Sequence, residues 1–407
     1  MAKARIIIFL PGISGSSLVT WGALRSAAAI VTPLWPDQVM NDLANGQVQA
    51  AETLLTNAGA SSPREAPIDD ATVVAYQPIA ASYATVISVL QNTLGAGTPT
   101  VTWQLGATRL SGNGDLVIGF GYDWRQSNGF SARFLQTLLS QIDAAWGRGT
   151  YEVALVAHSM GGLVARAYLE DIGRADAWLG AVRALMTLGT PHLGAPMALD
   201  AALNNKGVPS FDPAFGDFLI NDSNFPSDYE LFPPPHIAFV RDTATGDTLS
   251  IYQPDAFNAA IRAGVSPDNL AESQGFFSTL AYGRKVAPAA YYLIWGLCSQ
   301  PNPMSPDGST MCGFTWNGDN ANPQLAGTTE QGGGDGVVPT WSAQYKGFAA
   351  DGLYQAKYAD AAAMKSGTVS VNHFELVTSP DGLAQMGAWL QAAFTTQTPT
   401  IARPIRS

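Results

Sequence analysis

The chain has few charged residues and no concentration of positive charge. Only 13% of its 407 residues are charged, and 32 acidic against 21 basic side chains give a formal charge of -11. No cluster of Lys and Arg occurs, so the electrostatic footprint of a nucleic-acid-binding protein is missing. We therefore expect no nucleic-acid partner, and we expect any peripheral contact with a lipid surface to be apolar.

Cysteine is equally scarce. Cys298 and Cys312 are the only two, too few for a disulfide framework, and no histidine lies near them to complete a structural zinc site. We expect neither a metal nor a cofactor. Two reduced thiols and one loop-pinning disulfide, which would imply an oxidising compartment, both remain open.

Long hydrophobic runs are also lacking. No segment approaches the roughly 20 apolar residues that span a bilayer, and Arg5–Leu10 is too short for the core of a signal peptide. The sequence predicts a soluble protein, cytoplasmic as printed or secreted if a signal peptide has been removed. It does not indicate an oligomeric state.

Short apolar runs rich in β-branched residues alternate with segments of helical periodicity. Such runs are typical of parallel strands buried on both faces, and the alternation is typical of strand–helix–strand crossovers. Strands are predicted at Arg5–Leu10, Asp115–Phe120, Val153–Ala157, Val182–Leu188, Ala290–Trp295 and Thr368–Val371, and helices at Phe130–Trp146, Gly161–Glu170 and Leu383–Phe394. The pattern predicts one α/β domain over 1–407, with a mostly parallel central sheet and helices on both faces.

Two irregular stretches interrupt this alternation. Residues 33–83 contain one helical pattern, Asp37–Gln49, and little strand signal, which indicates an inserted cap or docking segment. Residues 196–280 are rich in proline and aromatic residues, which no regular strand accommodates, and we expect them to form a lid.

The sequence Ala157-His-Ser-Met-Gly161 stands between a predicted strand and a predicted helix. A serine hydroxyl needs a base and a sharp turn to act as a nucleophile, and the small residues two positions before and after Ser159, Ala157 and Gly161, permit that turn. The alternative is that Ser159 only caps the following helix.

A base and an acid must follow the serine. Of the four histidines, His373 lies after the last predicted strand, whereas His158, His192 and His236 are expected to be hydrogen-bonded structural imidazoles. Asp335, within Gly332-Gly-Gly-Asp-Gly336, suits the acid that orients the histidine. Asp307 and Asp319 are the alternatives.

The negative charge that develops on the substrate carbonyl needs backbone N–H donors. The residue after the nucleophile, Met160, and Ile13 in the loop Pro11–Gly15 are the expected pair. That loop lacks the Gly-Lys-Ser/Thr ending of a phosphate-binding loop, which excludes nucleotide binding.

These elements, together with Pro33–Trp35, Gly121–Arg125, Gly189–His192 and Phe225–Leu231, occur in an order that resembles the lecithin:cholesterol acyltransferase-like family of α/β-hydrolases. The resemblance implies a triad of Ser159, Asp335 and His373 and oxyanion donors at Ile13 and Met160. It also implies a lid formed by residues 205–250. It further implies a structural ion pair between Asp123 and Arg125. We add Trp35 and His192 as candidate substrate contacts.

The leading hypothesis is hydrolysis of a hydrophobic, lipid-like carboxylic ester through an acyl-enzyme on Ser159. The same intermediate resolved by an alcohol would make the protein an acyltransferase, and a different pocket would make it a polyester or lactone hydrolase. A non-catalytic binding protein on this fold is the remote alternative.

Overall fold

A computed structural model describes residues 2–20, 22–23, 33–56, 73–104, 108–204, 225–253, 265–281, 287–301, 305–317, 325–345, 350–357 and 370–395. Its centre is a seven-stranded sheet in the order β13-β10-β7-β6-β1-β5-β4. Every neighbouring pair in this sheet is parallel. The strands are β1 (Ala4–Leu10), β4 (Thr100–Trp103), β5 (Leu116–Phe120), β6 (Tyr151–His158), β7 (Val182–Leu188), β10 (Ala290–Trp295) and β13 (Gly352–Gln355).

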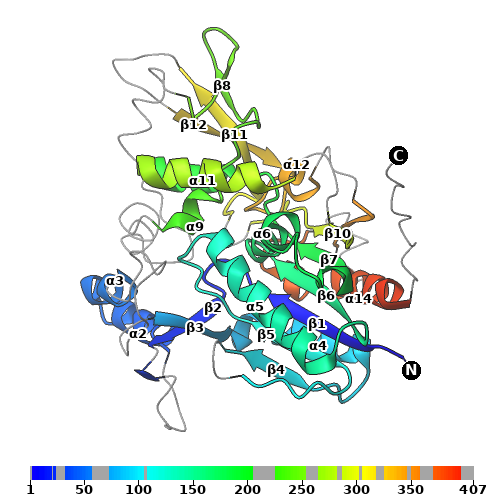
Figure 1. Ribbon diagram of the computed structural model, residues 1–407. Helices are drawn as coiled ribbons and strands as arrows, with labels where there is room; N and C mark the ends of the chain where they lie inside the picture. The colour runs from blue at the N-terminus through cyan, green and yellow to red at the C-terminus, as the bar shows by residue number, and fades with distance from the viewer. Residues whose placement is uncertain are drawn as a thin grey trace.

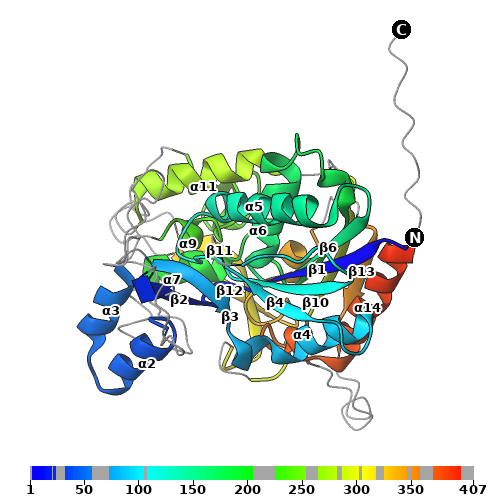
Figure 2. The same ribbon diagram turned by 60° about the horizontal axis from the view of Figure 1, so that its bottom comes forward.

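Helices cover both faces of the sheet (Figures 1 and 2). On one face lie α5 (Asn128–Trp146) and α6 (Gly161–Ala167), and on the other lie α4 (Ala80–Leu94) and α14 (Pro380–Thr395). Side chains of a strand alternate between faces. Ile8 of β1 therefore packs in a first hydrophobic cluster, with α5 and α6, and Phe9 packs in a second cluster, with α4 and α14. The architecture confirms the predicted fold class.

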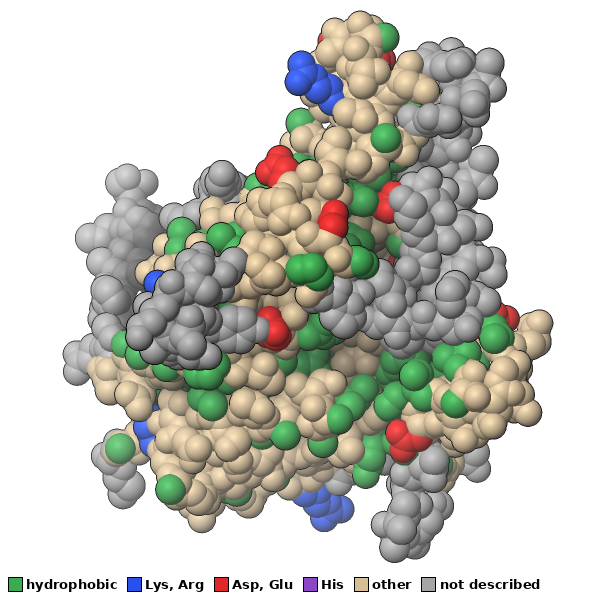
Figure 3. All heavy atoms as spheres, turned by 180° about the vertical axis from the view of Figure 1, so that it is seen from behind, with side chains coloured by type: hydrophobic (Ala, Val, Ile, Leu, Met, Phe, Trp, Pro, Cys, Tyr) green, Lys and Arg blue, Asp and Glu red, His purple; other side chains and the backbone are tan. Residues whose placement is uncertain are grey.

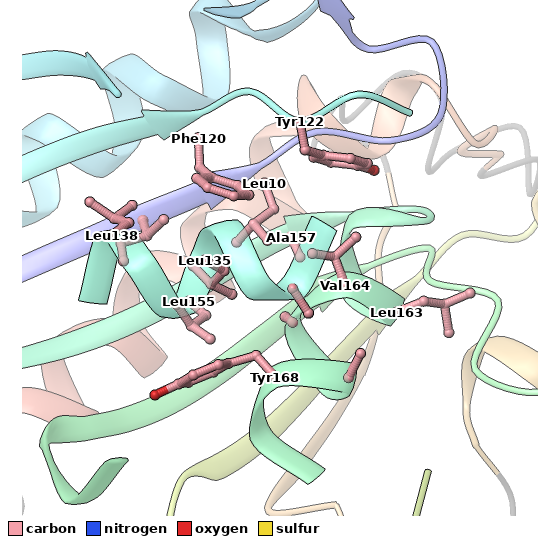
Figure 4. Close-up of a cluster of buried hydrophobic side chains, with 14 of the residues drawn as sticks. Leu10, Phe120, Tyr122, Leu135, Leu138, Leu155, Ala157, Leu163, Val164 and Tyr168 are labelled. Atoms are coloured by element: carbon pink, nitrogen blue, oxygen red, sulfur yellow. The ribbon is translucent and has the colours of Figure 1, made fainter. Parts of the chain in front are cut away.

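Burial on both faces explains why the central strands are continuous apolar runs. In β1, Ile8 lies in register with Leu155 of β6 and with Ile118 of β5, and all three side chains are fully buried. Figure 4 shows the first cluster, in which Leu135 and Leu138 of α5 pack towards the strand residues.

Most of the predicted strands are confirmed, and those at 182–188 and 290–295 have the predicted bounds. The strand predicted at 368–371 is wrong in its described part, because residues 370 and 371 belong to no strand; 368 and 369 lie outside the described residues. The edge of the sheet is β13 instead. Its four residues alternate in exposure and are too few for a distinct apolar run.

The single helix predicted at Asp37–Gln49 is also wrong. Two helices occupy this region, α2 (Asp37–Ala44) and α3 (Val48–Thr56), and Gly46 between them adopts a φ of 71°. A left-handed residue ends a helix, and glycine adopts that conformation at little cost. Further along, β3 (Val73–Pro78) pairs antiparallel with β2 (Ser16–Thr20).

The second expected insertion contributes to a separate four-stranded sheet, β12-β11-β8-β9. Here β8 (Val240–Asp242) and β9 (Thr248–Leu249) join β11 (Ser309–Trp316) and β12 (Leu325–Gln331), which come much later in the chain. Figure 1 shows this sheet beyond α11 (Pro267–Thr279), away from the central sheet. The insertion bounds 33–83 and 196–280 remain predictions.

Short helical elements complete the described chain: α7 (Pro196–Asn204), α9 (Pro226–Tyr229), α12 (Thr340–Ala343), a π-helical turn (Tyr168–Ile172) and two 3-10 turns (Leu179–Ala181 and Glu375–Val377). Within the described residues, no helix has both the length and the hydropathy required to cross a membrane.

Candidate active site

Ser159 occupies a sharp turn between β6 and α6. Its φ of 51° is a left-handed conformation that costs free energy for a residue with a side chain. Two hydrogen bonds hold the turn: the Ser159 N–H donates to the Leu188 carbonyl at 2.9 Å, and the Thr190 hydroxyl donates to the Ser159 carbonyl at 2.8 Å. The neighbouring strand β7 therefore fixes the position of the serine.

Small residues around Ser159 are required by the close approach of the backbone. A Cβ atom on Gly161 would lie 2.4 Å from the Pro11 carbonyl oxygen, and one on Gly162 would lie 2.1 Å from the Thr190 hydroxyl oxygen. A Cβ on Gly12 would lie 2.9 Å from the Ser159 Cβ. The turn can approach the loop after β1 because positions 12 and 161 are glycine, and it can approach Thr190 because position 162 is glycine.

The structure brings Ser159, His373 and Asp335 together, although they lie far apart in the sequence. His373 Nε2 is 2.9 Å from Ser159 Oγ, and His373 Nδ1 is 2.8 Å from Asp335 Oδ2. All three side chains are buried, at 4%, 1% and 6% exposure for His373, Asp335 and Ser159. This arrangement can move a proton from the serine hydroxyl to the imidazole.

The loop that carries Asp335 follows β12 and is held by its own hydrogen bonds. Asp335 Oδ1 accepts the N–H groups of Val337 at 3.1 Å and of Val338 at 2.8 Å, which leaves Oδ2 directed at the imidazole. The Asp335 carbonyl also accepts the His373 N–H at 2.9 Å. Acid and base are therefore joined through both side chain and backbone.

The two expected oxyanion donors lie on either side of this site. Met160 follows the serine directly, and Ile13 follows Gly12, which contacts the serine. Neither the Ile13 nor the Met160 backbone N–H forms a hydrogen bond with another described residue, so both N–H groups are available to donate to a ligand atom. Their role remains a prediction.

Three aromatic side chains hold the loop that bears Ile13 through hydrogen bonds to its backbone. The Trp35 indole N–H donates to the Ser14 carbonyl at 2.7 Å, and the Tyr122 hydroxyl donates to the Pro11 carbonyl at 2.8 Å. The Gly12 N–H donates to the Tyr83 hydroxyl oxygen at 3.0 Å. Tyr83 on α4 has no signal in the sequence, because only packing of the helix on the sheet brings it here.

The two candidate substrate contacts are both buried. His192 is fully buried, its Nε2 lies 3.1 Å from the Thr187 hydroxyl oxygen, and its ring stacks on Tyr345 at 5.2 Å. Burial lowers the pKa of His192 well below its usual range. Trp35 is 3% exposed and packs edge-on against Trp124. In this conformation neither ring is open to a substrate, and both act as structural supports.

The motif Tyr122–Arg125 connects separate parts of the molecule. Arg125 forms an ion pair with Asp123 at 2.7 Å and donates to the Leu55 carbonyl of α3, which agrees with a structural pair. Trp124 also packs edge-on against Phe225, just before α9.

The other residues singled out in the sequence are two alternative acids and the two cysteines. The Asp307 carboxylate accepts the Ser309 N–H at 3.0 Å and forms no bond to His373, and Asp319 lies outside the described residues. No disulfide joins Cys298 and Cys312, and burial raises the pKa of Cys312 to about 11. The described part of the chain contains no group of three or more His, Cys, Asp or Glu side chains that could hold a metal ion.

Part of the chain is similar to known proteins. The family model described as "Lecithin:cholesterol acyltransferase" matches residues 106–266, which include the turn at Ser159. Phospholipase A(1) LCAT3 of Arabidopsis thaliana is 32% identical over 91 residues, covering 22% of this chain and 20% of that protein. The uncharacterized protein YJR098C of Saccharomyces cerevisiae is 40% identical over 86 residues, covering 20% and 12%. The matches thus span a fifth or less of these relatives' own length.

A solved structure shares the fold over nearly the whole chain. The structure of the Tle4-Tli4 complex aligns with a TM-score of 0.59 and 16% identity, covering 98% of this chain and 100% of that one. The seven-stranded parallel sheet and this likeness show that the chain has the α/β-hydrolase fold. Within that fold class, the match of residues 106–266 to the lecithin:cholesterol acyltransferase family model supports the resemblance found in the sequence.

Proposed function

We propose that this protein is a serine hydrolase that cleaves carboxylic esters of hydrophobic, lipid-like substrates. The observation that carries the proposal is the hydrogen-bonded series from Ser159 Oγ through the His373 imidazole to the Asp335 carboxylate, at 2.9 and 2.8 Å. A nucleophile, a base and an orienting acid in this geometry are the requirements of acyl transfer through serine.

In the first half of the reaction, Ser159 Oγ attacks the ester carbonyl carbon while His373 Nε2 takes its proton. The Asp335 carboxylate holds the Nδ1–H and stabilises the imidazolium that forms. His373 then gives the proton to the departing alkoxide oxygen, which leaves as an alcohol, and the acyl group remains on Ser159. In the second half, water loses a proton to His373 as it attacks the acyl-enzyme, and His373 returns that proton to Ser159 Oγ as the acid is released.

The charge that develops on the carbonyl oxygen needs donors already in place. The N–H groups of Ile13 and Met160 are the proposed pair, since neither has a partner among the described residues. Preorganised donors of this kind stabilise the tetrahedral intermediate without reorganisation, and removing one typically costs about 100- to 1000-fold in kcat.

A hydrophobic substrate is supported by the surroundings of the base. Phe374, directly after His373, is 53% exposed and its ring lies edge-on 5.8 Å from the imidazole. On the face shown in Figure 3, hydrophobic side chains are spread widely with isolated charges between them. The names of one relative, a phospholipase A(1), and of the matching acyltransferase family point to lipid esters.

The decisive experiment compares the wild type with Ser159→Ala on p-nitrophenyl esters of increasing chain length and with a fluorophosphonate probe. We expect hydrolysis and labelling in the wild type, and neither in the variant. Ser131→Ala, which changes a buried serine on α5, is the matched control and is expected to keep both. Activity that survives Ser159→Ala would overturn the proposal.

Transfer of the acyl group to an alcohol is the second candidate, favoured by the family description that the chain matches. An alcohol that binds beside acyl-Ser159 would donate its proton to His373 in place of water. Product analysis with and without an added long-chain alcohol separates the two reactions, because transfer yields a new ester and hydrolysis yields only the free acid.

A further inference from the structure

A second series of hydrogen bonds lies beside the proposed triad and uses none of its side chains. The Gly12 N–H donates to Tyr83 Oη at 3.0 Å, Tyr83 Oη lies 3.1 Å from His158 Nδ1, and His158 Nε2 lies 3.1 Å from the His373 carbonyl oxygen. All of these groups are buried. The series therefore connects the loop of the expected oxyanion donor to the backbone of the proposed base.

The direction of each bond follows from the two ends. The His373 carbonyl can only accept, so His158 Nε2 must carry a proton and donate it. Neutral His158 then has a bare Nδ1, which accepts the Tyr83 hydroxyl proton, while the Tyr83 oxygen accepts the Gly12 N–H. Every donor in the series has an acceptor, and bonds aligned in one direction strengthen each other.

His158 is suited to remain neutral. Burial, and then the neighbouring His373, lower the pKa of His158 to about 3. The two imidazole rings lie 4.9 Å apart. A charge on His158 would oppose the imidazolium that forms on His373 during the reaction, so a neutral ring leaves the base free to accept its proton.

The surroundings leave little space for any other arrangement. A Cβ on Gly15 would lie 2.6 Å from the Tyr83 hydroxyl oxygen, and one on Gly12 would lie 3.1 Å from His158 Nδ1. The Tyr83 ring also packs on Phe9 at 5.0 Å and edge-on to His158 at 5.8 Å. The loop after β1 thus encloses the Tyr83 hydroxyl between its two glycines.

We propose that Tyr83 and His158 are positioning residues that set the distance between the oxyanion loop and the base. They touch no reacting atom. Tyr83 holds the Gly12 amide, which precedes the proposed donor Ile13, and His158 holds the His373 backbone. The expected effect of these residues on kcat rests on the proposed function, whereas the hydrogen-bonded series itself does not.

The first test is Tyr83→Phe, which removes one oxygen and leaves the Gly12 N–H without an acceptor. We expect kcat for ester hydrolysis to fall about tenfold with KM changed less than about twofold, because one buried hydrogen bond is lost and substrate binding is untouched. Tyr151→Phe is the matched control. Tyr151 is 2% exposed and donates to Asp143 at 2.9 Å, and this change should leave kcat unaltered.

His158→Gln tests whether the two residues act as one unit. The glutamine amide N–H can still reach the His373 carbonyl but offers Tyr83 no acceptor at the Nδ1 position. We expect the double variant with Tyr83→Phe to be no slower than the slower single variant, since interacting residues are not additive. Losses that multiply in the double variant, or equal kcat for Tyr83→Phe and Tyr151→Phe, would overturn the inference.

A third measurement needs no activity, and variants serve only to assign its signals. The chain has four histidines, so ¹⁵N-histidine spectra can be assigned with one substitution for each. We expect His158 to be the neutral Nε2–H tautomer from pH 5 to pH 8. An Nδ1–H tautomer, or protonation in this range, would refute the positioning series, whereas failure of the Ser159→Ala test would refute only the hydrolase proposal.

Discussion

Replacing Asp335 with asparagine should nearly abolish ester hydrolysis while leaving the fold intact. The side chain keeps its size, and the question is which of its two ends becomes the amide nitrogen. Asp335 Oδ1 accepts the N–H groups of Val337 and Val338, so the asparagine oxygen must take that position. The NH₂ group then stands where Oδ2 stood, 2.8 Å from His373 Nδ1.

An amide NH₂ cannot accept a hydrogen bond, and this forces a change in His373. The imidazole either keeps its proton on Nδ1 and opposes another donor, or moves the proton to Nε2 and can no longer accept one from Ser159. Losing a hydrogen bond to a charged group and leaving a buried donor unpaired cost together about 4 kcal/mol. A barrier higher by that amount lowers kcat roughly 1000-fold.

The assay is steady-state hydrolysis of a p-nitrophenyl ester at pH 7, with thermal unfolding to verify the fold. Asp307→Asn is the matched control, because Asp307 also accepts a backbone N–H in a loop but forms no bond to His373. It should retain activity within about twofold of the wild type. An Asp335→Asn variant that kept more than about a tenth of wild-type kcat would show that the carboxylate does not set the tautomer of His373.

Three further outcomes follow from buried contacts. Gly189 has a φ of 62°, and an added Cβ would lie 3.0 Å from the carboxylate of the proposed acid and 3.1 Å from Nδ1 of the proposed base. Gly189→Ala should therefore lower kcat by at least roughly tenfold in steady-state assays, and unchanged kcat would contradict the geometry. Arg166 pairs with Glu170 at 2.9 Å, and both side chains are buried. Arg166→Met should therefore lower the free energy of unfolding in urea by about 3–5 kcal/mol, and the double variant with Glu170→Leu should recover part of that loss. A double variant that lost as much stability as Arg166→Met alone would contradict a coupled pair. Burial lowers the pKa of His158 to about 3 and that of His192 well below 6.5, so the unfolded chain binds more protons below pH 6.5 and stability falls as pH drops. Between pH 6.5 and 5 this amounts to about 2 kcal/mol for His158, and His158→Gln should remove that share of the pH dependence measured by urea unfolding.

Periodicity along the sequence was sufficient to predict the five inner strands of the central sheet, β10, β7, β6, β1 and β5, but neither of its edge strands, β13 and β4. Strands such as β1 and β7 are buried on both faces, and that environment leaves a continuous apolar run that can be recognised locally. The turn at Ser159 is recognisable because close backbone approach requires small neighbours. Of the four histidines, only His373 follows the last predicted strand, where the base is expected, and this position led to its prediction.

Tertiary structure alone decided the features that depend on which segments meet. Pairing of β8 with β11 joins residues about 70 positions apart, and no local pattern records a partner at that distance. The burial of His192 and Trp35 follows from packing around them. The contact of Tyr83 with His158 arises because α4 packs on the face of the sheet opposite α6, and a helix carries no sign of which side chain will reach another element. Sequence by itself therefore determined the inner strands of the sheet and the proposed nucleophile motif, because their patterns are local, whereas packing determined what surrounds them.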